Sequence, residues 1–103
     1  MNDGIYEIEA VGVVFYSQTD EGNFFNWLDG IPCVESRKGY LRTLKIFLSV
    51  EKVDEENIRE ILALYKRYRI DMRSLVVLDR EEYAHWFRDK DASWYSQVFA
   101  AND

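Results

Sequence analysis

The chain has 103 residues, of which 48% are apolar and 31% are charged, and its formal net charge is −6. This length builds one hydrophobic core and leaves no room for a second, and the composition excludes a disordered chain. We therefore expect a single α+β domain over residues 1–103. The negative charge disfavours phosphate backbones as partners and favours basic proteins, or it serves solubility alone.

Cysteine content and apolar runs indicate the expected compartment. Cys33 is the only cysteine, so no internal disulfide forms, and the residue is expected to pack as a small buried side chain. No apolar run approaches the ~18 residues of a membrane span. The first residues lack the basic and apolar regions of a signal peptide. The sequence thus predicts a cytoplasmic protein.

Residues 5–16 begin with alternating polar and apolar residues and become apolar on both faces, which predicts a strand that enters the centre of a sheet. Gly12 is expected to mark a bulge. A helix follows, capped by Thr19 or Asp20, and Gly30 is expected to end it in the left-handed conformation. Its apolar stripe consists of Phe24, Trp27, Leu28 and Ile31.

Residues 33–50 read as a hairpin, with a short strand at 33–37, a turn at Lys38-Gly39 and a long strand at 40–50. The apolar face of the long strand is expected to carry Tyr40, Leu44, Ile46, Leu48 and Val50.

The clearest helix follows Asp54, the expected N-cap, where Val53 and Ile58 have the spacing of a hydrophobic staple. Acidic residues lie early in this helix and basic residues late, which complements the helix dipole. Its predicted buried stripe is Ile58, Ile61, Leu62, Tyr65 and Tyr68.

The last third of the chain predicts a short strand at 74–78 and a helix that Asp79 and Glu82 open as a capping box and that reaches Lys90. A final helical turn is expected from Asp91. The resulting order, βαββαβ followed by a helix, is that of the ferredoxin-like split βαβ fold, with an antiparallel sheet covered by helices. Another α+β arrangement of the same elements remains open.

On such a helix Glu82, His85 and Asp89 share one face, which suits a general base or a metal ligand set. The alternative is a solvated polar face opposite Tyr83, Trp86 and Phe87. With one histidine, one cysteine and no nucleophile or phosphate-loop motif, we expect neither catalysis nor a metal or cofactor.

A ferredoxin-like sheet also suits nucleic acids or small ligands, with Tyr6, Tyr40 and Arg42 as contacts. Lys38-Gly39-Tyr40 begins like a motif of RNA-recognition modules, as does Ile5-Tyr6. Both matches then fail, because Leu41 and Arg42 replace the residues expected next and Lys45 replaces a stacking ring. This module is the alternative interpretation.

The remaining class is a protein that binds another protein. Length, acidity and the stretch EEYAHWFRDKDASWY (81–95) make the chain similar to small bacterial immunity proteins of contact-dependent growth inhibition systems. The resemblance implies a cytoplasmic inhibitor that binds the C-terminal domain of a toxin, frequently a basic nuclease, and blocks its active site or substrate groove. The candidate partner-binding residues are Glu82, His85, Asp89, Asp91, Trp94, Tyr95, Asp20 and Glu21.

Overall fold

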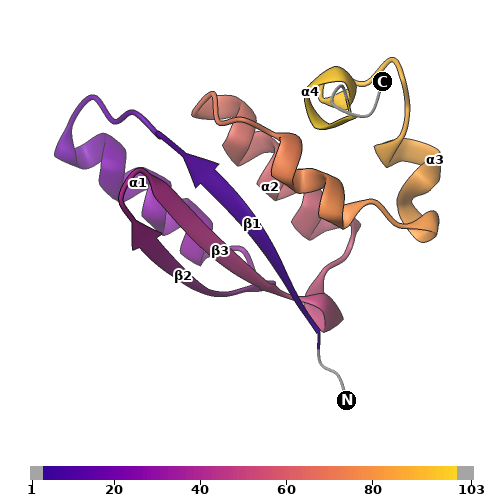
Figure 1. Ribbon diagram of the computed structural model, residues 1–103, viewed down its shortest axis with the longest axis horizontal. Helices are drawn as coiled ribbons and strands as arrows, with labels where there is room; N and C mark the ends of the chain where they lie inside the picture. Colours follow the sequence, from indigo (N-terminus) through magenta and orange to yellow (C-terminus); the bar gives the residue numbers. More distant parts are fainter. Residues whose placement is uncertain (1–3, 100–103) are drawn as a thin grey trace.

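A computed structural model describes residues 4–99, which form an α+β domain as predicted. Strands β1 (Ile5–Val11), β2 (Val34–Tyr40) and β3 (Thr43–Ser49) make an antiparallel sheet in the order β1-β3-β2. Helices α1 (Gln18–Asp29) and α2 (Glu55–Arg67) lie side by side on one face of this sheet (Figure 1). The shorter elements are η1 (Val50–Lys52), η2 (Arg73–Leu78), η3 (Glu81–Tyr83), α3 (Ala84–Phe87) and α4 (Tyr95–Phe99).

The core lies between the sheet and its two long helices. Ile8 of β1 pairs directly with Ile46 of β3, and both side chains are fully buried on the helical side. On the opposite side Glu7 and Lys45 form an ion pair with an N–O distance of 3.5 Å, and both are partly exposed. Alternate side chains therefore separate a buried face from a solvated one.

The predicted strand over 5–16 is too long, because β1 ends at Val11. Gly12 has a φ of +65°, and its N–H donates a 2.7 Å hydrogen bond to the carbonyl oxygen of Arg42. Gly12 is therefore a left-handed residue that ends the strand, and not a bulge within it. The apolar residues that follow form a loop.

Replacing Gly12 with alanine is expected to lower the free energy of unfolding by about 1–2 kcal/mol, because L-residues are strained at this φ. The added Cβ would also lie 2.8 Å from Nη2 of Arg42. Gly22 is the matched control, since it lies in α1 and a Cβ added there would meet no neighbouring atom within 4 Å. Gly22→Ala should stabilise the protein by about 0.5–1 kcal/mol, so urea denaturation should move the two midpoints in opposite directions.

The predicted N-cap of α1 is wrong by two or three residues, whereas the helix ends at Gly30 as predicted. Ser17 is the N-cap, and its hydroxyl accepts a 3.1 Å hydrogen bond from the backbone N–H of Asp20. The Asp20 carboxylate in turn accepts from the N–H of Tyr16. Gly30 has a φ of −83° and is not left-handed. The predicted stripe is correct in Phe24, Leu28 and Ile31, which are buried.

The hairpin turn is also displaced from its predicted place. Tyr40 pairs with Thr43, so the loop consists of Leu41 and Arg42 instead of Lys38 and Gly39. Leu41 takes a φ of +57°, the left-handed conformation that such two-residue hairpin loops require. Gly39 therefore lies within β2 and not in the turn. Tyr40 belongs to the exposed edge strand β2 and not to the apolar face of β3.

Helix α2 matches its prediction closely. The Asp54 carboxylate caps it by accepting a 2.9 Å hydrogen bond from the N–H of Asn57. Val53 and Ile58 are buried, in agreement with the staple. The hydroxyl of the buried Tyr65 donates a 2.8 Å bond to the carbonyl oxygen of Glu9, which fastens the helix to β1.

The predicted strand at 74–78 is wrong, because Arg73–Leu78 form the 3₁₀ helix η2. Leu75 and Leu78 are both buried three residues apart, which matches the 3₁₀ repeat and not strand alternation. The Ser74 hydroxyl accepts from the N–H of Glu9 and donates to its carbonyl oxygen. One side chain thus satisfies groups on the β1 edge that a fourth strand would have paired, and β1 is not a central strand.

The predicted helix up to Lys90 is reduced to η3 and the single turn α3. Asp79 does not cap it, since its carboxylate instead accepts a 2.6 Å hydrogen bond from Nε of Arg88. The last helix starts at Tyr95 and packs on η2, beside the β1 edge of the sheet (Figure 1). No helix within residues 4–99 is long and apolar enough to cross a membrane.

Candidate functional site

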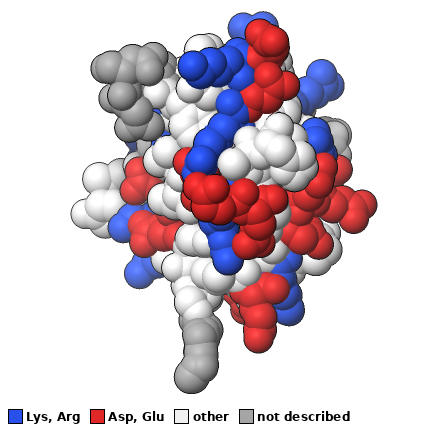
Figure 2. Space-filling view, turned by 90° about the vertical axis from the view of Figure 1, so that its right-hand side faces the viewer, with Lys and Arg blue, Asp and Glu red and all other residues white. Residues whose placement is uncertain are grey.

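The predicted partner-binding residues near the C-terminus gather around α3 and α4, on the side of the molecule shown in Figure 2. His85, Asp89 and Asp91 are exposed. Glu82 pairs with Arg80 at an N–O distance of 3.5 Å. Basic and acidic side chains are interleaved on this face (Figure 2), so it is not uniformly acidic.

The two aromatic candidates of this surface serve mainly to close the core. The indole Nε1 of Trp94 donates a 2.9 Å hydrogen bond to the carbonyl oxygen of Phe87, and its ring lies 5.9 Å from that of Trp86. The Tyr95 ring lies 5.0 Å from the Phe99 ring. Both side chains are half-buried, so a partner would meet only their outer edges.

Asp20 and Glu21 belong to a different surface. They lie in the first turn of α1, at the opposite end of the long axis from α3 and α4 (Figure 1). Asp20 is also engaged in the cap of its own helix. The eight predicted residues therefore do not converge on one contact site.

Glu82, His85 and Asp89 lack the continuous helix that would align them. Glu82 lies in η3, His85 in α3, and Asp89 follows the end of that helix. Within the described part of the chain, no group of three or more His, Cys, Asp or Glu side chains is placed to hold a metal ion.

Cys33 packs as the sequence predicts, with its side chain fully buried. Burial raises the pKa of its thiol to about 11, so the thiol stays protonated at neutral pH. Its backbone N–H donates a 2.8 Å hydrogen bond to Oδ1 of the buried Asn57. This residue therefore belongs to the joint between β2 and α2.

The three predicted nucleic-acid contacts also lie apart. Tyr6 is directly opposite the buried Leu48 and packs on the helical side, where its hydroxyl oxygen accepts a 3.1 Å hydrogen bond from Nη1 of Arg80. Tyr40 and Arg42 are exposed at the end of the hairpin. The sheet therefore offers no pair of stacking rings at those positions.

A pocket of about 440 Å³ lies between the end of α1 and the start of α2; we call it the acidic groove. Trp27 and Pro32 line it on one side, and Glu56 and Glu60 on the other. The Trp27 indole donates a 3.0 Å hydrogen bond to Oε1 of Glu60, which fixes ring and carboxylate next to each other.

The electrostatic potential of the acidic groove is negative for two reasons. Glu56 and Glu60 are exposed, and no ion pair between described residues neutralises them. The last turn of α1 contains no basic residue, so no charge within the helix offsets the negative end of its dipole. An aromatic face beside carboxylates is suited to a guanidinium or ammonium group.

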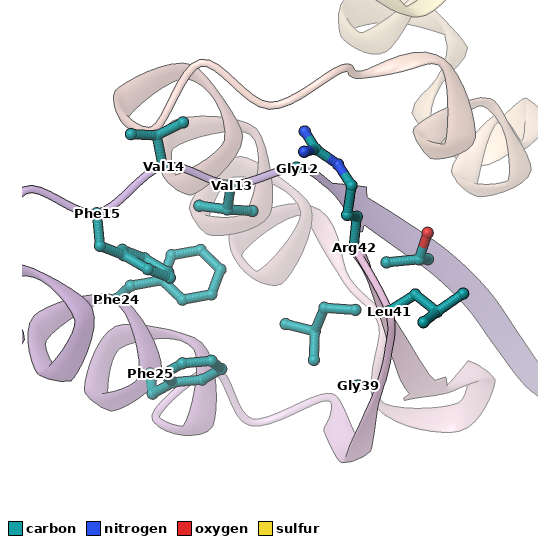
Figure 3. A pocket seen from close by; sticks show the side chains of 11 residues that line it. Gly12, Val13, Val14, Phe15, Phe24, Phe25, Gly39, Leu41 and Arg42 are labelled. Carbon is teal, nitrogen blue, oxygen red and sulfur yellow. The ribbon is translucent and has the colours of Figure 1, made fainter.

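A second hollow lies at the far end of the sheet; we call this end the tip, made of loop 12–16, the turn Leu41–Arg42 and residues 67–69 at the end of α2. Two pockets of about 320 and 410 Å³ share Gly12 and Val14 and so flank the loop. In the first, Phe24 and Phe25 of α1 lie on one side and the hairpin turn with Leu41 lies on the other, while Arg42 rises beside Gly12 (Figure 3).

Comparison with models of protein families, with curated proteins and with solved structures finds no match.

The sequence patterns did not predict the acidic groove or the two tip pockets. The sequence pattern places Trp27 in an apolar stripe and Glu60 in a dipole gradient, and only tertiary packing brings them together. The same reasoning extends the first strand through loop 12–16. The signal that could have revealed this loop is Gly12, because a glycine at the end of an alternating stretch separates the strand from an apolar run that has no place in the sheet.

Proposed function

We propose that this chain is a non-enzymatic protein inhibitor of the immunity type, which acts in the cytoplasm and neutralises a toxin domain by covering its active site or substrate groove. The acidic groove carries this proposal, because it joins an indole face, two carboxylates and a helix carbonyl end in one hollow. Basic toxin domains such as nucleases present arginine and lysine side chains, which such a groove accommodates.

The net charge of −6 supports the same proposal at longer range. It accelerates the encounter with a cationic protein, while the groove provides contacts that slow dissociation. The ferredoxin-like order is part of the proposal. The strand order β1-β3-β2 with both long helices on one face agrees with it, and η2 would occupy the place of the fourth strand.

The test is co-expression of this chain with the product of the adjacent reading frame, with cell survival and the affinity of the purified pair as measurements. Wild type should protect the cells. Glu56→Lys with Glu60→Lys should weaken binding by roughly 100-fold or more, because two favourable charge contacts become repulsive.

A matched charge reversal at exposed acids that do not line the groove, Glu35→Lys with Glu51→Lys, should leave protection intact. Loss of binding only in this control pair would place the contact elsewhere on the surface and remove the acidic groove from the proposal. Absence of any complex at micromolar concentration would contradict the proposal itself.

A further inference from the structure

Exposed apolar side chains concentrate at the tip. Among residues 4–99, seven large apolar side chains are exposed, and five of them belong to the tip or to the strand ends that adjoin it. These five are Val11, Val14, Tyr16, Tyr40 and Leu41. Tyr16 and Leu41 are the most exposed, at 90% and 89%. Isolated exposed apolar residues need no explanation, whereas a group of them beside a pocket is typical of a protein-binding surface.

The first tip pocket fits one apolar side chain. Its volume is about 320 Å³, and Phe24, Phe25 and Leu44 are among the apolar residues that line it. Leu41 forms its outer wall and Arg42 stands at its rim (Figure 3). The hollow is lined mainly by rings and branched side chains, and Arg42 is the one charged residue among the described residues that line it.

The charge of the tip is opposite to that of the whole chain. Arg42 lies beside the first pocket, and Arg67 and Arg69 line the second. None of the three belongs to an ion pair between described residues. The helix dipole accounts for Arg67 in the last turn of α2 and for Arg69 directly after its C-cap, but Arg42 lies on a hairpin. Asp20 is the one acid that lines these pockets, and the N–H of Tyr16 already occupies its carboxylate.

Two residues of the tip hold unfavourable backbone conformations. Leu41 and Arg69 are the only non-glycine residues with positive φ in the described part of the chain, both at 57°. Glycine would adopt this conformation without strain, yet these positions carry a long apolar and a long cationic side chain. The hairpin loop requires this conformation at Leu41, and the C-terminal cap of α2 requires it at Arg69, where the N–H of Ile70 donates a 2.9 Å hydrogen bond to the carbonyl oxygen of Tyr65. Both side chains are thereby held at the surface of the tip.

We infer that the tip is a second binding surface, which takes a segment of a partner protein that inserts an apolar side chain between flanking carboxylates. The apolar pocket receives the side chain, and Arg42, Arg67 and Arg69 pair with the carboxylates. This surface is separate from the acidic groove and does not depend on the proposed inhibitor function.

The test uses a blocked hexapeptide with two central leucines and two aspartates on either side, followed by amide NMR shifts of the labelled full chain. Saturable shifts are expected at Gly12, Val14 and Leu41, and added salt should weaken them because charge contributes. A peptide with lysines in place of the aspartates should bind at least about tenfold more weakly.

The decisive variants are Leu41→Gly and Arg69→Gly. Each should denature at the same urea concentration as wild type or at a higher one, because backbone strain is relieved. Each should nevertheless weaken peptide binding roughly tenfold, the scale of an interface hot spot. Val77→Ser removes an exposed apolar side chain from η2 instead, and should leave peptide binding unchanged.

Three results would overturn the inference. They are equal binding of the lysine peptide, unchanged affinity in Leu41→Gly, and tighter binding of a ten-residue oligothymidylate than of the aspartate peptide at the same amides. The last result would assign the tip to single-stranded nucleic acid, because exposed tyrosines and arginines also bind stacked bases.

Discussion

Phe24→Ala should lower the free energy of unfolding by about 4 kcal/mol, the typical cost of truncating a fully buried phenylalanine. The Phe24 side chain is completely buried in α1, and its ring contacts those of Phe15, Phe25 and Tyr68 at centroid distances of 5.0–5.3 Å. These three rings come from the loop after β1, from α1 itself and from the end of α2. The removed ring would therefore leave a cavity where three elements meet.

Urea denaturation with a shared slope is the measurement. Phe25→Ala is the matched control, since Phe25 is only half-buried and its ring lies under the Arg37 guanidinium at 4.3 Å. The control should cost about 1–2 kcal/mol. Equal losses in the two variants would mean that Phe24 is not the centre of this cluster. Because Phe24 also lines a tip pocket, its loss should change the amide shifts of the tip in the folded protein.

Asn57→Ala is expected to destabilise the protein by about 3 kcal/mol, from a buried donor left without an acceptor and from a weakened helix cap. Asn57 is 6% exposed. Its Oδ1 accepts the N–H of Cys33, and its Nδ2 donates a 2.6 Å hydrogen bond to the carboxylate of Asp54. One amide thus joins the strand side of the fold to the start of α2.

The pH dependence of this variant gives an independent check. Hydrogen bonds from Asn57 lower the pKa of Asp54 in the folded state. A lowered pKa stabilises the fold above the unfolded value of about 3.9, and this contribution is lost as the pH falls through the lower folded value. The stability difference between wild type and Asn57→Ala should therefore narrow from neutral pH to about pH 2 to 3.

Asn26→Ala is the control for this substitution, since Asn26 is an exposed asparagine of α1. It should change the free energy of unfolding by less than about 0.5 kcal/mol. A similarly small effect of Asn57→Ala would contradict the role assigned to its amide.

The sequence predicts the elements whose signals are local. The N-cap Asp54, the staple of Val53 and Ile58 and the buried stripe determine α2 within a few turns of chain. The cap and the staple are confirmed, and so are four of the five stripe residues; the fifth, Tyr68, lies at the C-cap and is half-buried. The 74–78 segment shows the opposite case. Its apolar run suits a strand. The Ser74 hydroxyl, however, bonds to the backbone N–H and carbonyl oxygen of Glu9, 65 residues away, and no local sequence pattern predicts that contact. The predicted place of the hairpin turn is wrong for a related reason. The register between β2 and β3 puts Leu41, and not Gly39, at the loop position that needs a positive φ.

The candidate site follows the same division. The exposure of His85, Asp89 and Asp91 could be predicted from the local pattern. The adjacency of Trp27 and Glu60, and that of Gly12 and Arg42, required the chain to be folded. The acidic groove and the tip both form where helices and loops from distant parts of the sequence pack together, and the periodicity of the sequence does not predict such tertiary contacts.

Ser74 also limits how far this sheet can extend between molecules. With η2 and α4 beside β1, only the outer edge of β2 is open for lateral pairing with another strand within residues 4–99. Two molecules that joined through β2 would hide that edge in both, and neither would retain a free border for a third. Pairing of folded molecules through their sheet edges should therefore stop at closed pairs.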